Sequence, residues 1–175
     1  MKNTLQKPLL TLLFAIVVSA ITFSSCKKDS AASTGYYVKA TVNGTEINYT
    51  GFTSAIFLTM PSGEATPFNV LDIEGMKVQN GTTDVFAIDV TDFSPITTKT
   101  YTDAAVGDTF QGTISYYDDS TNEYNSVLAI TPAVNITITE ITSSYVAGTF
   151  SGTTVAITNG NTAVITNGSF KVKRQ

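Results

Sequence analysis

Hydrophobic and polar residues alternate with a period of two along most of this chain, and this pattern limits the fold more than any other feature. The alternation is cleanest in residues 134–139, and it is equally regular in 86–91. Such a period is typical of β-strands with one buried face, and no segment shows a convincing helical period. The pattern predicts strands in residues 37–42, 45–49, 86–91, 109–116, 124–130, 134–139, 146–150 and 170–172.

Short polar turns separate these strands. Asn43-Gly44 joins 37–42 to 45–49 and favours a two-residue hairpin in which both turn residues have positive φ. Further turns are expected at 118–122 and 159–161.

The fold class that follows is all-β, an antiparallel β-sandwich of about ten strands. An open up-and-down barrel of the lipocalin-like kind is the alternative, because both folds come from the same spacing of strands and turns. In a barrel, the small residues Gly112, Ala129 and Gly148 either open a cavity or only relieve crowding.

The composition excludes several classes of chemistry. The chain has no histidine, one cysteine and no tryptophan. Catalytic triads that need histidine, histidine-bound zinc and imidazole acid–base catalysis are therefore excluded. We expect no cofactor and no metal.

The N-terminus reads as a bacterial lipoprotein signal. Lys2 and Lys7 precede the apolar run 9–21, which is shorter than the roughly 20 residues of a permanent membrane helix. Phe23-Ser24-Ser25-Cys26 follows as a lipobox. We expect residues 1–25 to be a signal peptide and Cys26 to be the lipidation site, with an uncleaved N-terminal anchor as the alternative.

Three regions follow from this interpretation: the signal peptide 1–25, the lipidated cysteine with a small polar tether at 26–35, and one all-β domain at 36–175. Acyl chains on Cys26 would hold the domain on a membrane. Lys27, in place of an aspartate, favours the outer membrane, with display on the cell surface expected and the periplasmic face as the alternative.

The charge of the mature chain argues against nucleic acid as a partner. Without Lys2 and Lys7 it carries eight basic and fourteen acidic side chains, a net charge of −6. Its basic clusters are Lys27-Lys28 near the anchor and Lys171, Lys173 and Arg174 at the C-terminus. We expect the C-terminal cluster to be a solvated strand end.

The Cys-Lys-Lys-Asp start resembles that of Bacteroidota outer-membrane lipoproteins, and the C-terminal third is similar to a family of such proteins with a β domain of unknown function. The similar segments are 134–141, 146–152 and 165–172. The resemblance implies a location and a β fold, and no catalytic residue. Within it, Phe150 is expected to fill the core between glycines that bend the sheet, and Asn167-Gly168 to form a turn with positive φ.

Three groups of residues are candidate sites. Asp118–Glu123 has alternating oxygen ligands like a calcium loop, but Glu123 stands where glycine is needed, so a solvated turn is expected. Glycoside chemistry needs only two carboxylates, which Asp84, Asp89, Asp92 and Asp103 could supply. A surface for a ligand or glycan could use Tyr36, Tyr37, Tyr101, Tyr116, Tyr117 and Tyr124, with Tyr117 the exposed member of its adjacent pair.

The function expected from the sequence is a lipid-anchored, non-enzymatic binding or structural module outside the cytoplasm. Its partner would be a glycan, a peptide or a protein at the surface. A lipocalin-like carrier of an apolar ligand is the alternative, and a carboxylate-based glycan-active enzyme is the remote one.

Overall fold

The all-β prediction is confirmed: a computed structural model shows one antiparallel sheet of eleven strands. It describes residues 35–62, 65–79, 82–103, 109–118, 122–129 and 134–175. The strands are β1 (Tyr37–Val42), β2 (Thr45–Tyr49), β3 (Phe52–Ser62), β4 (Ala65–Gln79), β5 (Thr82–Asp92), β6 (Thr100–Thr102), β7 (Phe110–Asp118), β8 (Asn122–Asn125), β9 (Asn135–Ile141), β10 (Tyr145–Ala156) and β11 (Thr162–Lys173). No helix within the described ranges is long and apolar enough to cross a membrane.

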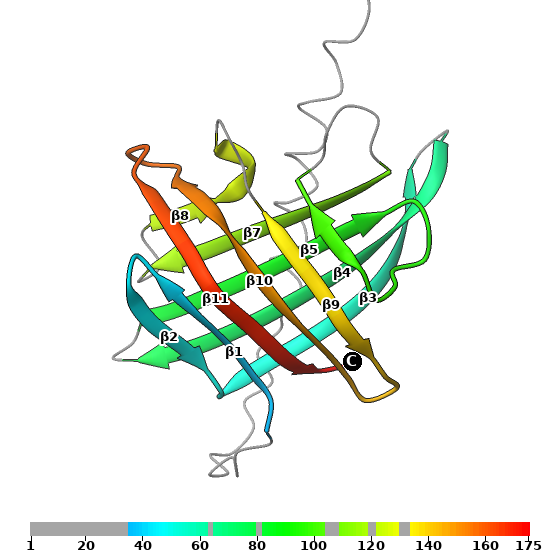
Figure 1. Ribbon diagram of the computed structural model, residues 1–175, viewed down its shortest axis with the longest axis horizontal. Helices are drawn as coiled ribbons and strands as arrows, with labels where there is room; N and C mark the ends of the chain where they lie inside the picture. The colour runs from blue at the N-terminus through cyan, green and yellow to red at the C-terminus, as the bar shows by residue number, and fades with distance from the viewer. Residues whose placement is uncertain (1–34, 63–64, 80–81, 104–108, 119–121, 130–133) are drawn as a thin grey trace, which may run out of the picture. The chain divides into compact units, whose positions relative to one another are not determined.

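The sheet curls over itself and is nearly closed. Its strand order is β2-β1-β11-β10-β8-β7-β5-β4-β3, with β9 also paired to β10 and β6 paired to β9. In Figure 1, β1, β11, β10 and β9 form a front layer that crosses β3, β4, β5 and β7 behind it. The seam is bridged where Arg174 pairs with Ala55 of β3. The fold thus combines the two packed layers of a sandwich with the continuous sheet of a barrel.

The core lies between these layers and follows the predicted alternation. Phe86, Ile88 and Val90 are fully buried, as are Ile136 and Val172. Every residue of the buried apolar cluster lies between Val38 and Val172. Among the residues that the structure describes, the buried apolar cluster thus lies within 38–172.

Two glycines that could have opened a cavity instead relieve crowding. A Cβ on Gly112 would lie 2.9 Å from the side chain of Ile136, and one on Gly148 would lie closer still to the carbonyl oxygen of Thr137. Ala129 is half-buried beyond the end of β8. The interior beside both glycines is filled by neighbouring strands.

The predicted hairpin is confirmed. Asn43 and Gly44 have φ of 48° and 83°, which is the conformation that matches the twist of β1 and β2. The turn at 159–161 is also present, with Gly160 at a φ of 73°.

Two sequence predictions were wrong in detail. The predicted strand 124–130 ends at Asn125, because the Asn125 side chain accepts a hydrogen bond from the Val127 amide and begins a short 3-10 helix, η2 (Ser126–Leu128). Asn167-Gly168 is not a turn but a bulge inside β11: Asn167 has a φ of 53°, whereas Gly168 does not have positive φ. Phe150 does fill the core beside register shifts at Gly148 and Gly152, as predicted.

Candidate binding cleft

A row of aromatic rings runs from the core towards one end of the sheet. Phe150 and Phe86 have ring centroids 5.2 Å apart, Phe86 and Tyr116 are 5.5 Å apart, and Tyr116 and Tyr124 are 5.8 Å apart. Phe86, Tyr116 and Tyr124 are direct cross-strand partners on β5, β7 and β8. Because the buried end of the row is packed, it fixes the orientation of the two tyrosines at its outer end.

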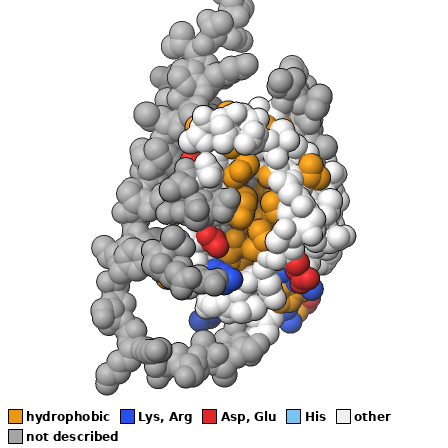
Figure 2. Space-filling model, turned by 90° about the vertical axis from the view of Figure 1, so that its left-hand side faces the viewer, with side chains coloured by type: hydrophobic (Ala, Val, Ile, Leu, Met, Phe, Trp, Pro, Cys, Tyr) orange, Lys and Arg blue, Asp and Glu red, His pale blue; other side chains and the backbone are white. Residues whose placement is uncertain are grey.

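These tyrosines line a cleft of about 420 Å³. This volume is within the range of small-molecule sites, roughly 300–1,000 Å³. The lining residues are Val42, Asn43, Thr45, Glu46, Ile47, Asn48, Lys77, Asp84, Tyr116, Tyr124 and Ala163. In Figure 2, hydrophobic side chains gather in a hollow between polar neighbours, with acidic and basic side chains close by.

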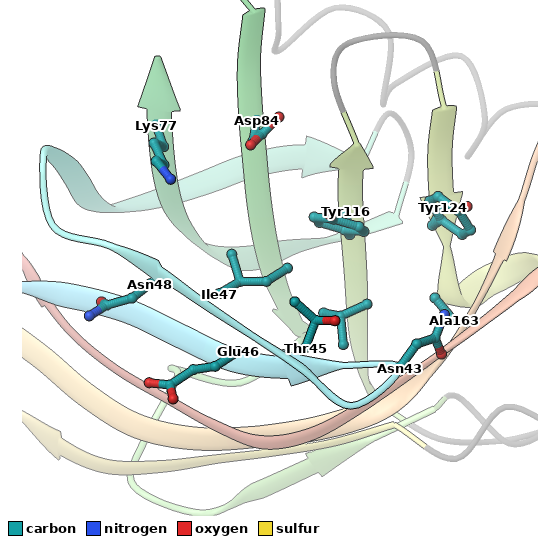
Figure 3. A pocket seen from close by; sticks show the side chains of 11 residues that line it. Asn43, Thr45, Glu46, Ile47, Asn48, Lys77, Asp84, Tyr116, Tyr124 and Ala163 are labelled. Atoms are coloured by element: carbon teal, nitrogen blue, oxygen red, sulfur yellow. The ribbon is translucent and has the colours of Figure 1, made fainter. Parts of the chain in front are cut away.

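One wall of the cleft is the β1–β2 hairpin. The Asn43 amide donates to the Val164 carbonyl (3.0 Å), and the Asn43 side chain accepts from the Val164 amide (2.9 Å). These two hydrogen bonds hold the turn against β11. In Figure 3, Thr45 and Ile47 of this hairpin lie on the side of the cleft opposite Tyr116 and Asp84.

The other wall consists of neighbouring strand ends. Lys77 and Asp84 are direct partners on β4 and β5, and Tyr116 and Tyr124 continue the wall on β7 and β8. The cleft therefore offers aromatic surface, the opposed charges of Lys77 and Asp84, and the amide group of Asn43, with Glu46 and Asn48 on the outward face of the hairpin at its rim. Such a lining suits a polar molecule with an apolar face.

The four carboxylates considered for glycoside chemistry do not converge. Asp84 lines the cleft, whereas Asp89 lies on the outward face of β5 opposite Asp72. Asp92 is 1% exposed and forms a 2.7 Å ion pair with Lys99. Asp103 accepts a 2.6 Å hydrogen bond from the Val134 amide. Asp92 and Asp103 thus make structural contacts with Lys99 and with the Val134 backbone.

Asp72 and Asp89 form an unusual pair of acids. They are directly opposed across β4 and β5, and Glu74 lies on the same face. Burial is the largest cause that raises the pKa of Asp72, followed by the negative charges of Asp89 and Glu74. Burial and the charge of Glu74 raise the pKa of Asp89, and a hydrogen bond from Thr113 opposes this rise. The Asp72–Asp89 pair consequently resists ionisation.

The six candidate tyrosines divide into three groups. Tyr116 and Tyr124 line the cleft, and Tyr101 is fully buried, with its hydroxyl donating to the Thr97 carbonyl. Tyr36 and Tyr37 are half-buried at the start of β1.

Tyr117 points away from the cleft but is half-buried, so the prediction of an exposed Tyr117 holds only in part. Burial first, and then Glu123, raise the pKa of its hydroxyl to about 12.

The remaining candidates lie wholly or partly outside the described residues. These are Cys26, the 1–25 signal peptide and positions 119–121 of the calcium-like turn. Asp118 and Asn122 are paired as the last rung of the β7–β8 hairpin. No cluster of three metal-ligating side chains is present among the residues that the structure describes.

No motif or spacing in the sequence pointed to Glu46, Ile47, Asn48 or Lys77 as site residues. The Asn43-Gly44 turn was visible, but the strands that it faces cannot be read from local pattern. Lys77 in particular belongs to β4, whose bounds the alternation did not reveal.

No protein-family model, curated protein or solved structure matches this chain.

Proposed function

We propose that this chain is a lipid-anchored binding module outside the cytoplasm, without enzymatic activity, whose cleft takes a carbohydrate. The observation that carries this proposal is the aromatic row ending in Tyr116 and Tyr124 inside a cleft of about 420 Å³. Sugars have apolar C–H faces and hydroxyl edges, so they suit an aromatic surface surrounded by hydrogen-bonding groups.

The chemistry of the cleft favours a neutral or zwitterionic sugar. Tyr116 and Tyr124 offer ring surface and hydroxyl groups, which suit recognition at low entropic cost. Asn43 offers both a donor and an acceptor, and Lys77 and Asp84, direct partners on β4 and β5, balance each other in charge. A strongly charged ligand would meet one group of its own sign.

The anchor is the second part of the proposal. Cys26 would carry the lipid after removal of residues 1–25, as in the Bacteroidota outer-membrane lipoproteins that the chain resembles. The outer membrane, with exposure at the cell surface, is the location that we propose. A surface module of this kind would bring a glycan to the cell.

A lipocalin-like carrier is the second candidate, since the sheet is nearly closed. Its interior would have to hold an apolar ligand, but Tyr49, Phe86, Tyr101 and Phe170 are packed there with at most 1% exposure. This packing favours a ligand in the cleft over one between the layers.

An enzyme is the remote candidate. Glu46 and Asp84 both line the cleft, but the Glu46 carboxylate points away from Asp84 in Figure 3. Glycosidases need two carboxyl groups that flank one bond, about 5–9.5 Å apart. The orientation of Glu46 thus supports binding over hydrolysis.

A thermal-shift screen of residues 26–175 against glycans, fatty acids and calcium tests the proposal. A ligand at 100 times its Kd adds about 2.7 kcal/mol, which for a domain of this size raises Tm by roughly 5–10 °C. We expect a glycan to produce such a shift. Shifts with fatty acids alone would favour the carrier instead.

A pair of tyrosine variants locates the ligand. Tyr124→Ala should weaken binding by about 10-fold or more, because aromatic anchors dominate binding energy at such sites. Tyr145→Ala, on the outward face of β10, should leave the Kd unchanged. Equal effects of both variants would contradict binding in the cleft.

A further inference from the structure

The outward face of the front layer carries a basic strip. Tyr37 of β1 pairs with Lys171 of β11, Lys39 pairs with Ser169, and Lys173 pairs with Tyr145 of β10. Their strand neighbours Val38, Phe170 and Val172 point into the core, so this set lies on the outer side of the sheet. Three lysines and two tyrosines from three strands therefore share one surface.

Aromatic rings hold two of these lysines in place. The Lys171 ammonium lies 4.4 Å from the centre of the Tyr145 ring, and that of Lys39 lies 5.3 Å from the Tyr37 ring. This face also carries two acids. The Glu140 carboxylate accepts a 2.5 Å hydrogen bond from the Tyr145 hydroxyl, and Glu46 of β2 pairs with Thr41, two residues along β1 from Lys39. Tyrosine and lysine side by side suit the polar boundary of a membrane.

The opposite layer carries acidic groups in place of lysines, although burial raises the pKa values of these carboxyls. Asp72, Glu74 and Asp89 share the outward face of β4 and β5. Of the six lysines and arginines after residue 35, four are in β1 or at the end of β11: Lys39, Lys171, Lys173 and Arg174. An anionic surface would orient a domain with this asymmetry so that the basic layer faces that surface.

The first strand, β1, also begins beside this strip. β1 starts where β11 ends, at one edge of the front layer (Figure 1). Ten residues join Cys26 to Tyr36, and such a length spans at most about 35 Å when fully extended. A lipid on Cys26 would hold the start of β1 within about 35 Å of the membrane, and the charge of the strip would then select the face that meets the lipid. Asn43, at the cleft, is at the other end of β1, about 20 Å further along.

We propose that Lys39, Lys171 and Lys173, with Tyr37 and Tyr145, dock against the phosphate headgroups of the membrane that holds Cys26. This orientation leaves the cleft turned away from the lipid. The proposal rests on the anchor of the proposed function, and it does not depend on which ligand the cleft binds.

A vesicle experiment tests the docking without relying on acylation in the cell. Residues 26–175 contain the buried apolar cluster of the described residues, and the thiol of Cys26, the one cysteine, can be coupled to a maleimide lipid. The vesicles are phosphatidylcholine alone or an equal mixture with phosphatidylglycerol. Acetylation of each lysine by an N-hydroxysuccinimide ester is then followed by mass spectrometry.

In the anionic vesicles, acetylation of Lys39, Lys171 and Lys173 should slow by about threefold or more, because anionic lipid attracts nearby lysines. Lys77, at the cleft, should react at the same rate in both vesicles. High salt should remove the difference, since it screens these charges. Equal rates for the three lysines in both vesicles, or equal protection of Lys77, would overturn the proposal.

Variants provide a second, independent readout. With Cys26→Ser and no lipid, co-sedimentation with anionic vesicles should fall by about 10-fold or more when Lys39, Lys171 and Lys173 are all changed to Gln. Lys77→Gln is the matched control and should sediment like the parent protein. Loss of sedimentation in both variants would show a general charge effect and contradict a docking face. A negative glycan screen would leave either result standing.

Discussion

Gly75 lies where β4 passes under β1 and β2. A Cβ at this position would be 2.7 Å from the Cβ of Val38 and 3.1 Å from that of Tyr49, atoms that cannot rotate away. Gly75→Ala should therefore lower the free energy of unfolding by about 2–3 kcal/mol, as overpacking does. Gly51→Ala is the control, because its nearest atom would be 3.9 Å away. Urea denaturation of both variants measures the difference, and equal stabilities would contradict this close approach of the layers.

Asp72 and Asp89 make stability depend on pH. Their pKa values are raised in the folded protein by burial and by neighbouring negative charge. The folded protein thus binds protons more tightly than the unfolded chain. The free energy of unfolding should fall as the pH rises above about 4, the ordinary pKa of aspartate, until both carboxyls are ionised.

Asp89→Asn should reduce this fall in the free energy of unfolding at high pH. At pH 8 the variant should be more stable than the parent by about 1 kcal/mol, the scale of like charges opposed across strands, and the gain should shrink towards pH 4. Urea denaturation at several pH values provides the measurement, and parallel pH profiles for Asp89→Asn and the parent would contradict the account.

The features that could be predicted from the sequence are those that depend on neighbouring residues alone. Asn43-Gly44 was predictable because a two-residue turn is specified by its own residues. The opposition of Asp72 and Asp89 was not, since it depends on the register between two long strands. Asp89 was expected on an outward face, but its partner there was not foreseen.

At the level of the element, β11 shows how a bulge can resemble a turn. Thr166 and Asn167 are consecutive exposed residues, after which the alternation resumes with Gly168 buried. The register with β10 shifts at the same place. Asn-Gly favours positive φ in either setting, so composition alone could not separate a chain reversal from a bulge within a continuous strand.

Substitutions at Asn167 test this bulge. Asn167→Val should cost about 1–2 kcal/mol, because a β-branched side chain is strained at positive φ. Asn167→Gly should be tolerated within a few tenths of a kcal/mol, since glycine adopts this conformation freely. Thermal denaturation distinguishes the two. A stable Asn167→Val variant would show that the residue does not hold positive φ.

The alternation of hydrophobic and polar residues did not predict two further strands. β3 and β4 are 11 and 15 residues long, yet no strand was predicted between 49 and 86. Both faces of these strands carry apolar residues, such as Ile56 outside and Ala55 inside, so the period of two is obscured. The predicted strand 124–130 was wrong for the opposite reason. Its alternation was regular, but the Asn125 side chain caps the 3-10 helix that ends the strand.

For the molecule as a whole, the C-terminus closes the seam of the sheet. The Gln175 amide donates to the Ala55 carbonyl, and the Arg174 side chain donates to the Thr142 carbonyl and lies 4.4 Å from the Phe57 ring centre. Removal of Arg174 and Gln175 should lower the free energy of unfolding by about 1–3 kcal/mol, because each hydrogen bond contributes roughly 0.5–1.5.

Gln175→Ala is the matched control for this truncation, since it keeps the backbone bonds and should leave stability unchanged. Chemical denaturation compares the two. A truncated chain as stable as the parent would show that the seam is not held by these residues.

The closure of the sheet could not be predicted from the sequence, and the reason is physical. Alternation and turns establish strands and their neighbours along the chain, which sufficed for the all-β class. Whether two layers join into one sheet depends on pairs distant in sequence, such as β8 with β10. The cleft arises from the same long-range arrangement, so Tyr116 and Tyr124 could be suspected singly but not placed opposite the β1–β2 hairpin.

Amide NMR of residues 26–175, during titration with the glycan selected by the thermal screen, shows whether the cleft binds a carbohydrate. We predict that shift changes concentrate on Tyr116, Tyr124 and the 43–48 hairpin, and that Tyr124→Ala abolishes them. Changes that centre on the inward residues of the core, or on no surface in common with the cleft, would contradict the account.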